Sequence, residues 1–463
     1  MFRLFRVFVP ASVVALLVSE FIIIYACYFV AALFLFPQDP QLFLVDDGGW
    51  LRIVAVVLCL ILAVYFHDLY HHFRVKSRIL LYQQVGIIIG TAFLIQSALA
   101  YGQLRRLILP TWLMIAGSAL TMIALPAWRM IYGRYVFTVL TPERVLFLGL
   151  SPLIVEIMEY FAEHPEAGSH TVGYVEDHCE PHAPDPRRLG DISQLRQVVA
   201  ESKPQRIVVG LSERRGRLPV HDLLEIRLSG TQVEDALTTY ETTFGRISTR
   251  VLCPSQLVFS SNAFGPNRRR VLLHSIYSIA IALAATVSAG PLMLLTAAVV
   301  KLTSPGPALF RQQRVGKDGR IFTLYKFRSM YLDAEMSSGA VWAKADDPRI
   351  TRIGKWIRRL RIDELPQLFN VLKGEMSVVG PRPERPEFVR DLTKRIPYYA
   401  QRHCVKPGIT GWAQINHRYA DTVEDTIIKL EYDLFYIKNL APALDAFIIF
   451  HTAKVMLLSR GAR

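Results

Sequence analysis

The stretch RIGKWIRRLRIDELPQLFNVLKGEMSVVGPRP, residues 352–383, places two adjacent carboxylates, Asp363 and Glu364, among fixed positive charges. The pair falls at a predicted helix start, where Pro366 is tolerated in the first turn and the helix dipole favours ionised carboxylates. The cations of this stretch and its surroundings are Lys326, Arg328, Arg358, Arg359, Arg361 and Arg382.

Carboxylates among several fixed cations suit chemistry on a diphosphate. One carboxylate can attack phosphorus, the other can hold Mg²⁺, and arginines can clamp phosphate oxygens. An Asp before a helix is more commonly only an N-cap. On spacing alone, therefore, both interpretations of Asp363 stay open.

The preceding stretch, residues 304–330, reads SPGPALFRQQRVGKDGRIFTLYKFRSM. Its Ser-Pro-Gly-Pro opening predicts a rigid turn, and residues 315–319 predict a turn between two strands. A strand over residues 321–326 would deliver Lys326 and Arg328 to one place.

The composition predicts a chain that lies partly in lipid, because 52% of the residues are hydrophobic and only 20% are charged. The net charge of +14 suits anionic headgroups or phosphorylated substrates. No nucleic-acid-binding motif accompanies this charge, so we expect no nucleic acid as partner. The five cysteines are scattered without CxxC spacing, which argues against a disulfide framework or a zinc site.

Four apolar stretches predict a four-helix transmembrane region over residues 1–136. They cover residues 8–36, 51–65, 85–101 and 111–128 and approach the ~20 residues that span hydrocarbon. Basic residues at the N-terminus, in the second loop and after the fourth stretch predict that these parts face the cytoplasm. His67, His71 and His72 are interpreted as a wet interfacial cluster rather than a metal site.

Alternating strands and helices predict a small parallel α/β domain over residues 143–253. We expect strands at 144–150, 171–175 and 206–210, and helices at 151–164, 192–200 and 221–228. The turn GLSPLIVEI after the first strand lacks the remaining glycines of GxGxxG. A structural or regulatory role is therefore favoured over a cofactor site.

A fifth apolar segment, residues 272–302, is predicted to enter the membrane and turn back. Arginines 268–270 precede it and Lys301, Arg311 and Arg314 follow it, which favours the cytoplasm for both ends. Pro291 removes a helix hydrogen bond and disfavours helical geometry at Gly290, so we expect a break there. The alternative is a plain kinked span.

The run from 268 to the C-terminus resembles the catalytic domain of the monotopic phosphoglycosyl transferases, the bacterial sugar transferase family. The similarity rests on the two stretches quoted above, on KPGITGWAQI at 406–415 and on EYDLFYIKN at 431–439. The whole layout resembles the large subgroup that initiates O-antigen or exopolysaccharide synthesis. The implied fold is an α/β membrane protein with a four-helix transmembrane bundle, a Rossmann-like α/β domain and a mainly helical catalytic domain, 268–463, that carries a re-entrant helix.

The resemblance also implies roles for individual residues. Asp363 would be the nucleophile, and Glu364 would bind Mg²⁺. Arg382 would contact phosphate, and Pro291 would break the re-entrant helix. The basic positions that match without an individual role are Lys326, Arg328, Arg358 and Arg361. The family usually has Ser before the proline, where this chain has Gly290.

The implied activity is transfer of a sugar phosphate from a UDP-sugar to undecaprenyl phosphate, with UMP released through an aspartyl-phosphosugar intermediate. It places the catalytic domain on the cytoplasmic face of a bacterial inner membrane, and relatives suggest a homodimer. One rival is a metal-dependent glycosyltransferase, which would release UDP, but the chain lacks its Asp-x-Asp spacing. Another is an inactive membrane scaffold or sensor. The identity of the sugar stays open.

Overall fold

The computed structural model divides the chain into two compact units, one mainly of residues 9–234 and one mainly of residues 235–463. It describes residues 2–4, 7–9, 11–38, 40–70, 77–101, 107–136, 142–164, 168–177, 187–211, 218–252, 267–331, 349–417 and 422–457. Near the N-terminus, β1 (Phe2–Leu4) and β2 (Val7–Val9) form a two-stranded sheet.

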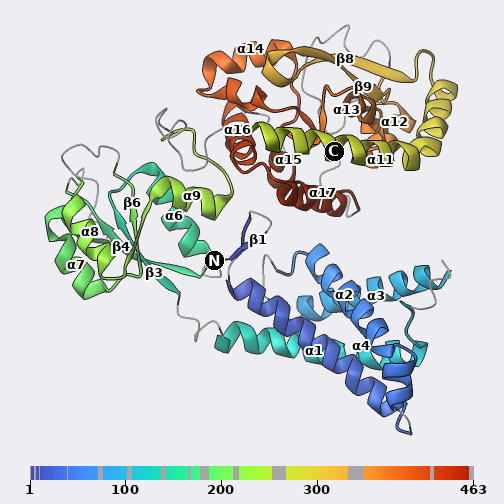
Figure 1. The fold of residues 1–463 in the computed structure, drawn as a ribbon, viewed down its shortest axis with the longest axis horizontal. Helices are drawn as coiled ribbons and strands as arrows, with labels where there is room; N and C mark the ends of the chain where they lie inside the picture. The colour runs from blue at the N-terminus through green and yellow to red at the C-terminus, as the bar shows by residue number, and fades with distance from the viewer. Residues whose placement is uncertain are drawn as a thin grey trace. The chain divides into compact units, whose positions relative to one another are not determined.

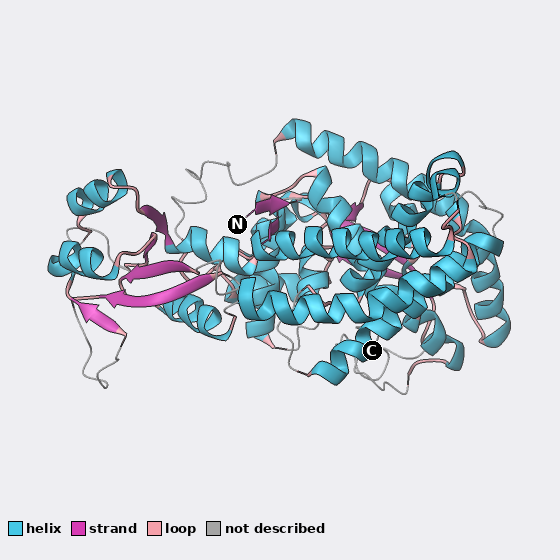
Figure 2. Ribbon diagram, turned by 90° about the horizontal axis from the view of Figure 1, so that it is seen from below, coloured by secondary structure: helices cyan, strands magenta, loops and turns pink. Residues whose placement is uncertain are grey.

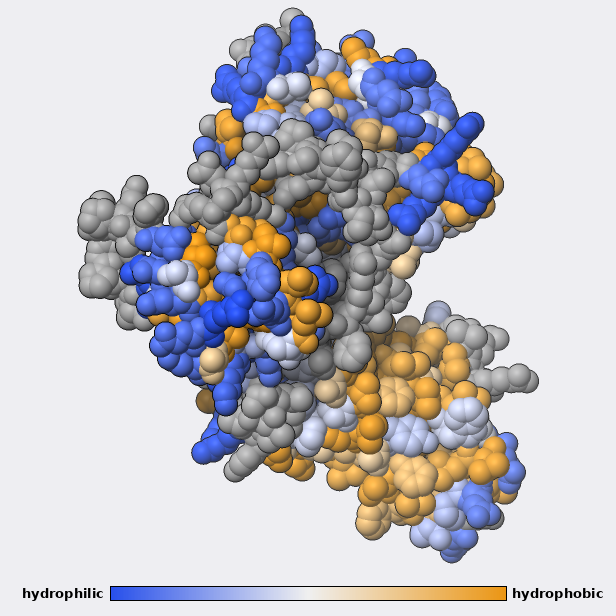
Figure 3. Space-filling model, turned by 60° about the vertical axis from the view of Figure 1, so that its left-hand side comes forward, coloured by the Kyte–Doolittle hydropathy of each residue, from blue (hydrophilic) through white to orange (hydrophobic). Residues whose placement is uncertain are grey.

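Four long apolar helices open the first unit (Figure 1). They are α1 (Ala11–Leu35), α2 (Gly49–Phe66), α3 (Arg78–Tyr101) and α4 (Thr111–Ile131), with short π-helical turns η1 (Leu42–Asp46) and η3 (Tyr132–Val136). By length and composition these helices and α11 (Arg268–Thr303) are apolar enough to cross a membrane. Hydrophobic side chains gather on the outside of the four helices, as Figure 3 shows. The four predicted spans are thus confirmed as apolar helices, while His71 and His72 lie outside the described residues.

A buried ion pair lies in the interior of the helical part. Arg129 Nε lies 2.6 Å from Glu20 Oε1, and both side chains are almost fully buried. Tyr70 donates a hydrogen bond to Glu20 Oε2 at 2.8 Å, and Arg129 Nη1 donates to the Leu69 carbonyl at 3.1 Å. The pair therefore joins α1, α4 and the chain after α2.

The parallel sheet predicted for the α/β domain is confirmed. Its sheet has the order β5-β4-β3-β6-β7, with parallel pairing of β3 to β4, β3 to β6 and β4 to β5. The strands are β3 (Glu143–Leu148), β4 (Ser169–Val175), β5 (Arg188–Gly190), β6 (Arg206–Val209) and β7 (Gln232–Asp235). The helices of this domain are α6 (Pro152–Glu163), η5 (Ile192–Gln194), α7 (Leu195–Ser202) and α8 (Val220–Leu228).

Helices cover both faces of this sheet (Figure 2). Leu146 and Leu148 of β3 pack in one cluster with residues of α7 and α8, whereas Phe147 packs against Phe161 of α6. Gly149, where β3 ends, has φ +90°, and a Cβ there would meet Leu211 at 2.8 Å. The turn after β3 therefore needs glycine for its own packing.

The second unit begins with α9 (Ala236–Phe244), capped by Asp235, and continues with the long helix α11. Next comes an antiparallel hairpin of β8 (Leu309–Val315) and β9 (Ile321–Phe327), joined at η6 (Lys317–Gly319) as predicted. Then follow α12 (Arg352–Arg359), η7 (Ile362–Glu364), α13 (Gln367–Leu372), β10 (Ser377–Val379), α14 (Pro386–Arg395), η8 (Tyr399–Cys404), β11 (Gly408–Thr410), α15 (Trp412–Asn416), α16 (Val423–Lys438) and α17 (Pro442–Leu457).

Helix α11 supports the elements that carry the predicted site. In its first half Ala282 packs with Phe322 of β9 and Leu368 of α13, and in its second half Met293 packs with Ile357 of α12. Pro291 lies inside α11, which is one helix by its hydrogen bonds rather than two separate ones. Its ribbon nevertheless changes direction between its green and yellow parts (Figure 1).

The buried ion pair gives a first prediction. Glu20→Leu or Arg129→Leu should each destabilise the helical part by about 3–5 kcal/mol, because each leaves one buried charge without its partner. The double replacement should recover most of this loss. The measurement is maleimide labelling of Cys27 and Cys59, which lie half-buried in α1 and α2, during thermal unfolding of the full chain. Equal losses in both single variants and the double variant would contradict the prediction.

Candidate functional site

The carboxylate pair lies in a single 3-10 turn rather than at the start of a long helix. Arg361, just before η7, adopts the left-handed conformation with φ 56°, which is unusual for a residue with a Cβ. This turn directs the following two carboxylates inward, and each of the two residues is only 8% exposed. Strained backbone of this kind persists where the surrounding structure holds it, often at functional sites.

Glu364 is surrounded by cations from three separate segments. Lys326 Nζ donates to Glu364 Oε1 at 3.1 Å, and Arg382 Nη2 donates to the same oxygen at 2.9 Å. Arg361 Nη1 lies 4.0 Å from it. Burial opposes the ionisation of Glu364, but Arg382, Lys326 and Arg361 together hold its pKa well below its usual range. Glu364 is therefore a fixed anion.

Asp363 has the opposite electrostatics. Burial raises the pKa of Asp363, Lys326 opposes this rise, and the adjacent Glu364 adds to it. Asp363 Oδ1 is buried without a hydrogen-bond partner among the described residues. The expectation that a helix dipole favours the ionised form was therefore wrong for Asp363, because η7 is a single turn and burial dominates.

Asn370 of α13 fixes the distance between the carboxylates and the hairpin. Its Oδ1 accepts from the Tyr325 amide at 3.1 Å, and its Nδ2 donates to the Thr323 carbonyl at 2.7 Å. These bonds attach α13 to β9 immediately before Lys326. The sequence analysis missed Asn370, whose signal is a polar side chain inside the apolar run LFNVL.

Arg382 reaches the pair from a turn that two strands present. β10 pairs in parallel with β11, and the Gly380 amide donates to the Thr410 carbonyl at 2.8 Å. A Cβ at Gly380 would lie 2.6 Å from the Lys406 carbonyl oxygen, so only glycine allows the two segments to come so close. The motif KPGITGWAQI thereby supports the turn that carries Arg382.

The remaining predicted residues are divided between the site and its surroundings. Arg358 of α12 is half-buried, and its charge lowers the pKa of Asp363. Arg328 is not brought to the pair: its Nη2 donates to the carbonyl and hydroxyl oxygens of Ser304 at 2.8 and 2.7 Å. In the structure Arg328 therefore secures the C-terminal end of α11.

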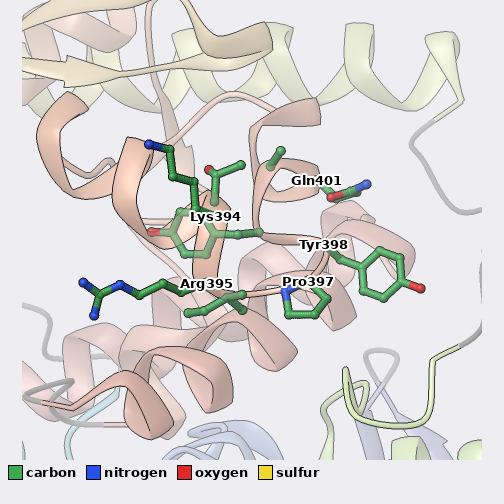
Figure 4. Close-up of a pocket in the computed structure, with 9 residues that line it drawn as sticks. Lys394, Arg395, Pro397, Tyr398 and Gln401 are labelled. Atoms are coloured by element: carbon green, nitrogen blue, oxygen red, sulfur yellow. The ribbon is translucent and has the colours of Figure 1, made fainter.

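A separate hollow of about 220 Å³ lies on the surface of the same unit, lined by residues 393–401. Figure 4 shows Lys394, Arg395 and Tyr398 around it. None of the predicted site residues lines this hollow, so it is distinct from the carboxylate pair.

The fold and the site together define a class of protein. Apolar helices long enough to span a bilayer occur in the same chain as a buried carboxylate pair ringed by cations. Buried cations around an unpartnered carboxylate oxygen are suited to binding an anionic substrate. The chain is thus a membrane protein with a candidate active site for phosphorylated compounds.

Comparison with known proteins identifies the family. The family model described as bacterial sugar transferase matches residues 269–459 of the chain. The chain is 35% identical over 329 residues to the UDP-glucose:undecaprenyl-phosphate glucose-1-phosphate transferase of Xanthomonas campestris pv. campestris, covering 69% of this chain and 68% of the relative. It is 34% identical over 311 residues to the enzyme of that name from Escherichia coli (strain K12), covering 66% of each. The chain belongs to the bacterial sugar transferase family.

Another relative is more similar over a shorter region. The UDP-N-acetylgalactosamine-undecaprenyl-phosphate N-acetylgalactosaminephosphotransferase of Aeromonas hydrophila is 56% identical over 173 residues. That match covers 37% of this chain and 41% of the relative. The names of these relatives thus include two different sugars.

The opposite electrostatics of the two carboxylates give a second prediction. Asp363→Asn should raise the melting temperature at neutral pH, because a carboxylate whose folded pKa is raised costs stability once the pH exceeds its unfolded pKa. Glu364→Gln should lower it, because Glu364 stabilises the fold above its unfolded pKa. Each kcal/mol corresponds to about 2–4 °C in a unit of this size.

The measurement is differential scanning calorimetry of the full chain in nanodiscs. The advantage of Asp363→Asn should disappear below about pH 3, where Asp363 is protonated in both states. Shifts of the same sign for both variants at neutral pH would refute this assignment.

Proposed function

We propose that the protein transfers a sugar phosphate from a UDP-sugar to undecaprenyl phosphate and releases UMP. The reaction would be the first membrane step in the synthesis of an exopolysaccharide, capsule or O-antigen. The observation that carries the proposal is the buried Asp363 oxygen without a partner, next to a carboxylate that three cations hold. The named activities of the relatives supply the substrate class.

Asp363 is the nucleophile of the proposed reaction. An Asp363 oxygen bonds to the β-phosphorus of the UDP-sugar while the bond from that phosphorus to the bridging oxygen of UMP breaks. A phosphate oxygen of undecaprenyl phosphate then attacks the same phosphorus, and the Asp363–phosphorus bond breaks. The raised pKa of Asp363 makes its ionised form a better electron-pair donor than an ordinary carboxylate.

The basic side chains stabilise the charge on the transferred group. Lys326 and Arg382 already point at this site through their bonds to Glu364, so they need little reorganisation when a diphosphate arrives. Arg358 and Arg361 add positive charge beside Asp363. Fixed cations of this kind contribute most of the catalysis in phosphoryl transfer.

The carboxylates also fit a magnesium ion. Magnesium is typically bound by one or two carboxylates together with substrate phosphates and water. Within the described residues the ion pairs of Glu364 all use Oε1, which leaves Oε2 for a metal, and Asp363 Oδ1 is a second free oxygen donor. When bound, Mg²⁺ would neutralise charge on the diphosphate. No group of three or more His, Cys, Asp or Glu in the described part forms a metal site of its own.

Helix α11 would hold this site at the cytoplasmic face of the inner membrane. Basic residues stand at both its ends, and large apolar side chains such as Leu283 and Leu294 are exposed on it. The change in direction of its ribbon and the position of Pro291 support a helix that enters one leaflet and returns.

The released nucleotide tests the reaction. With undecaprenyl phosphate and a panel of UDP-glucose, UDP-galactose and UDP-N-acetylhexosamines, one donor should yield UMP. Mass spectrometry of quenched enzyme should find a sugar phosphate on Asp363. Asp363→Asn should abolish the adduct and lower turnover on the order of 10⁴-fold. Asp318→Asn is the matched control, because Asp318 is an exposed carboxylate of η6 in the same unit. Release of UDP would refute the proposal.

Removal of the metal tests the role of Glu364. Excess chelator should stop turnover, and added Mg²⁺ should restore it. Glu364→Gln should raise the Mg²⁺ concentration for half-maximal activity on the order of tenfold or more, because a ligand is lost. Unchanged turnover in excess chelator would exclude a magnesium requirement.

A further inference from the structure

A second buried arginine holds the backbone from which Arg382 projects. Arg402 of η8 is 3% exposed, and its Nη2 donates to the Arg382 carbonyl oxygen at 2.9 Å. Nη1 of the same guanidinium donates to the Tyr399 hydroxyl at 2.7 Å. Among the described residues the ion pairs of Glu364 come from Lys326, Arg361 and Arg382 and not from Arg402. Its hydrogen bond toward the site goes to the peptide group of Arg382.

Arg402 is itself fixed by a buried carboxylate of α16. Asp433 Oδ2 lies 2.8 Å from Arg402 Nη2, and Asp433 is only 1% exposed. Burial raises the pKa of Asp433, and the charge of Arg402 opposes this rise. Desolvation offsets much of the attraction in a buried pair of this kind, so its geometry says more than its contribution to stability.

Other contacts secure the two ends of the same turn. On one side the Gly408 amide donates to the Pro381 carbonyl at 3.0 Å. On the other side Arg314 Nη1 donates to the Pro383 carbonyl at 2.9 Å, and Lys429 Nζ donates to Glu384 Oε1 at 2.7 Å. The Arg402 bond falls between these contacts, at the residue whose side chain reaches Glu364. It is thus placed to set the direction of the Arg382 side chain.

We propose that Arg402, oriented by Asp433, is a positioning residue for Arg382 in the transfer reaction. This inference rests on the proposed function and extends it to a residue outside the site. A guanidinium is required because its planar set of N–H donors can bond to the Arg382 carbonyl, the Tyr399 hydroxyl and the Asp433 carboxylate at the same time. A lysine ammonium lacks that geometry. Arg402→Lys keeps the positive charge beside Asp433 but loses the planar arrangement of N–H donors.

The first measurement is hydrogen–deuterium exchange of the full chain in nanodiscs without substrate. In Arg402→Lys the amides of Gly380 and Gly408 should exchange roughly tenfold faster than in the wild type. The reason is that the turn carrying Arg382, which both amides help to hold, loses one charged hydrogen bond. Amides of α13 should be unchanged. Lys438→Met is the matched control. It removes another ion pair of α16, between Lys438 and Glu241 at 2.5 Å, and this pair does not involve the turn that carries Arg382.

The second measurement is a double-mutant cycle on UMP release. Arg402→Lys should lower kcat/KM roughly tenfold alone and less than about twofold when Arg382 is already replaced by lysine. Lys438→Met should stay near the wild type in both backgrounds. A purely structural role for Arg402 would instead give equal losses in the two backgrounds.

Faster exchange confined to the turn together with non-additive losses would support the inference. Unchanged exchange at Gly380 and Gly408, or additive losses, would overturn it. If the wild type releases no UMP from any donor, the proposed function fails, and the exchange measurement alone then decides whether Arg402 holds the turn.

Discussion

The arrangement of the catalytic unit depends on one oxygen atom, Oε1 of Glu364. Lys326 reaches this oxygen from the hairpin strand β9, and Arg382 reaches it from the turn after β10. Arg361, the residue directly before η7, is the third cation beside it. A carboxylate this deeply buried is stable only when it is paired, so the three segments must pack together for Glu364 to be accommodated. The interaction that makes Glu364 a fixed anion thus also assembles the cations around Asp363.

The adjacent carboxylates Asp363 and Glu364 have pKa values displaced in opposite directions. Neighbouring carboxylates whose environments separate their pKa values commonly have distinct roles in a reaction. Lys326 and Arg382 bond directly to Glu364, whereas Asp363 Oδ1 has no hydrogen-bond partner in the part of the chain that the structure describes. Lys326 and Arg358 act on Asp363 through their charge. In the proposed reaction the more basic carboxylate, Asp363, forms the bond to phosphorus, and the ion-paired Glu364 binds the cation.

The sequence predicted what short-range patterns encode. The apolar helices, the parallel sheet, the β8–β9 hairpin and the convergence of Lys326 and Arg382 on the carboxylate pair all follow from local spacing and from resemblance. Partners distant in the chain were not predictable in this way. Arg328 stands two residues from Lys326 but bonds to Ser304. Nothing in the sequence distinguishes Arg402 from the other basic residues, and its role follows only from its contacts with Asp433 and the Arg382 carbonyl in the structure.

The catalytic unit also extends beyond the stretch that matches the family. That match begins at residue 269, whereas the compact unit begins at Asp235. Glu431 of α16 explains the difference, because its Oε1 accepts from the Thr249 amide at 2.9 Å and its carbonyl accepts from the Ile247 amide at 3.1 Å. Two residues further along α16, Asp433 fixes Arg402. The acidic residues of the motif EYDLFYIKN therefore act inside the protein: one anchors the segment after α9, and the other holds the support of the active-site turn.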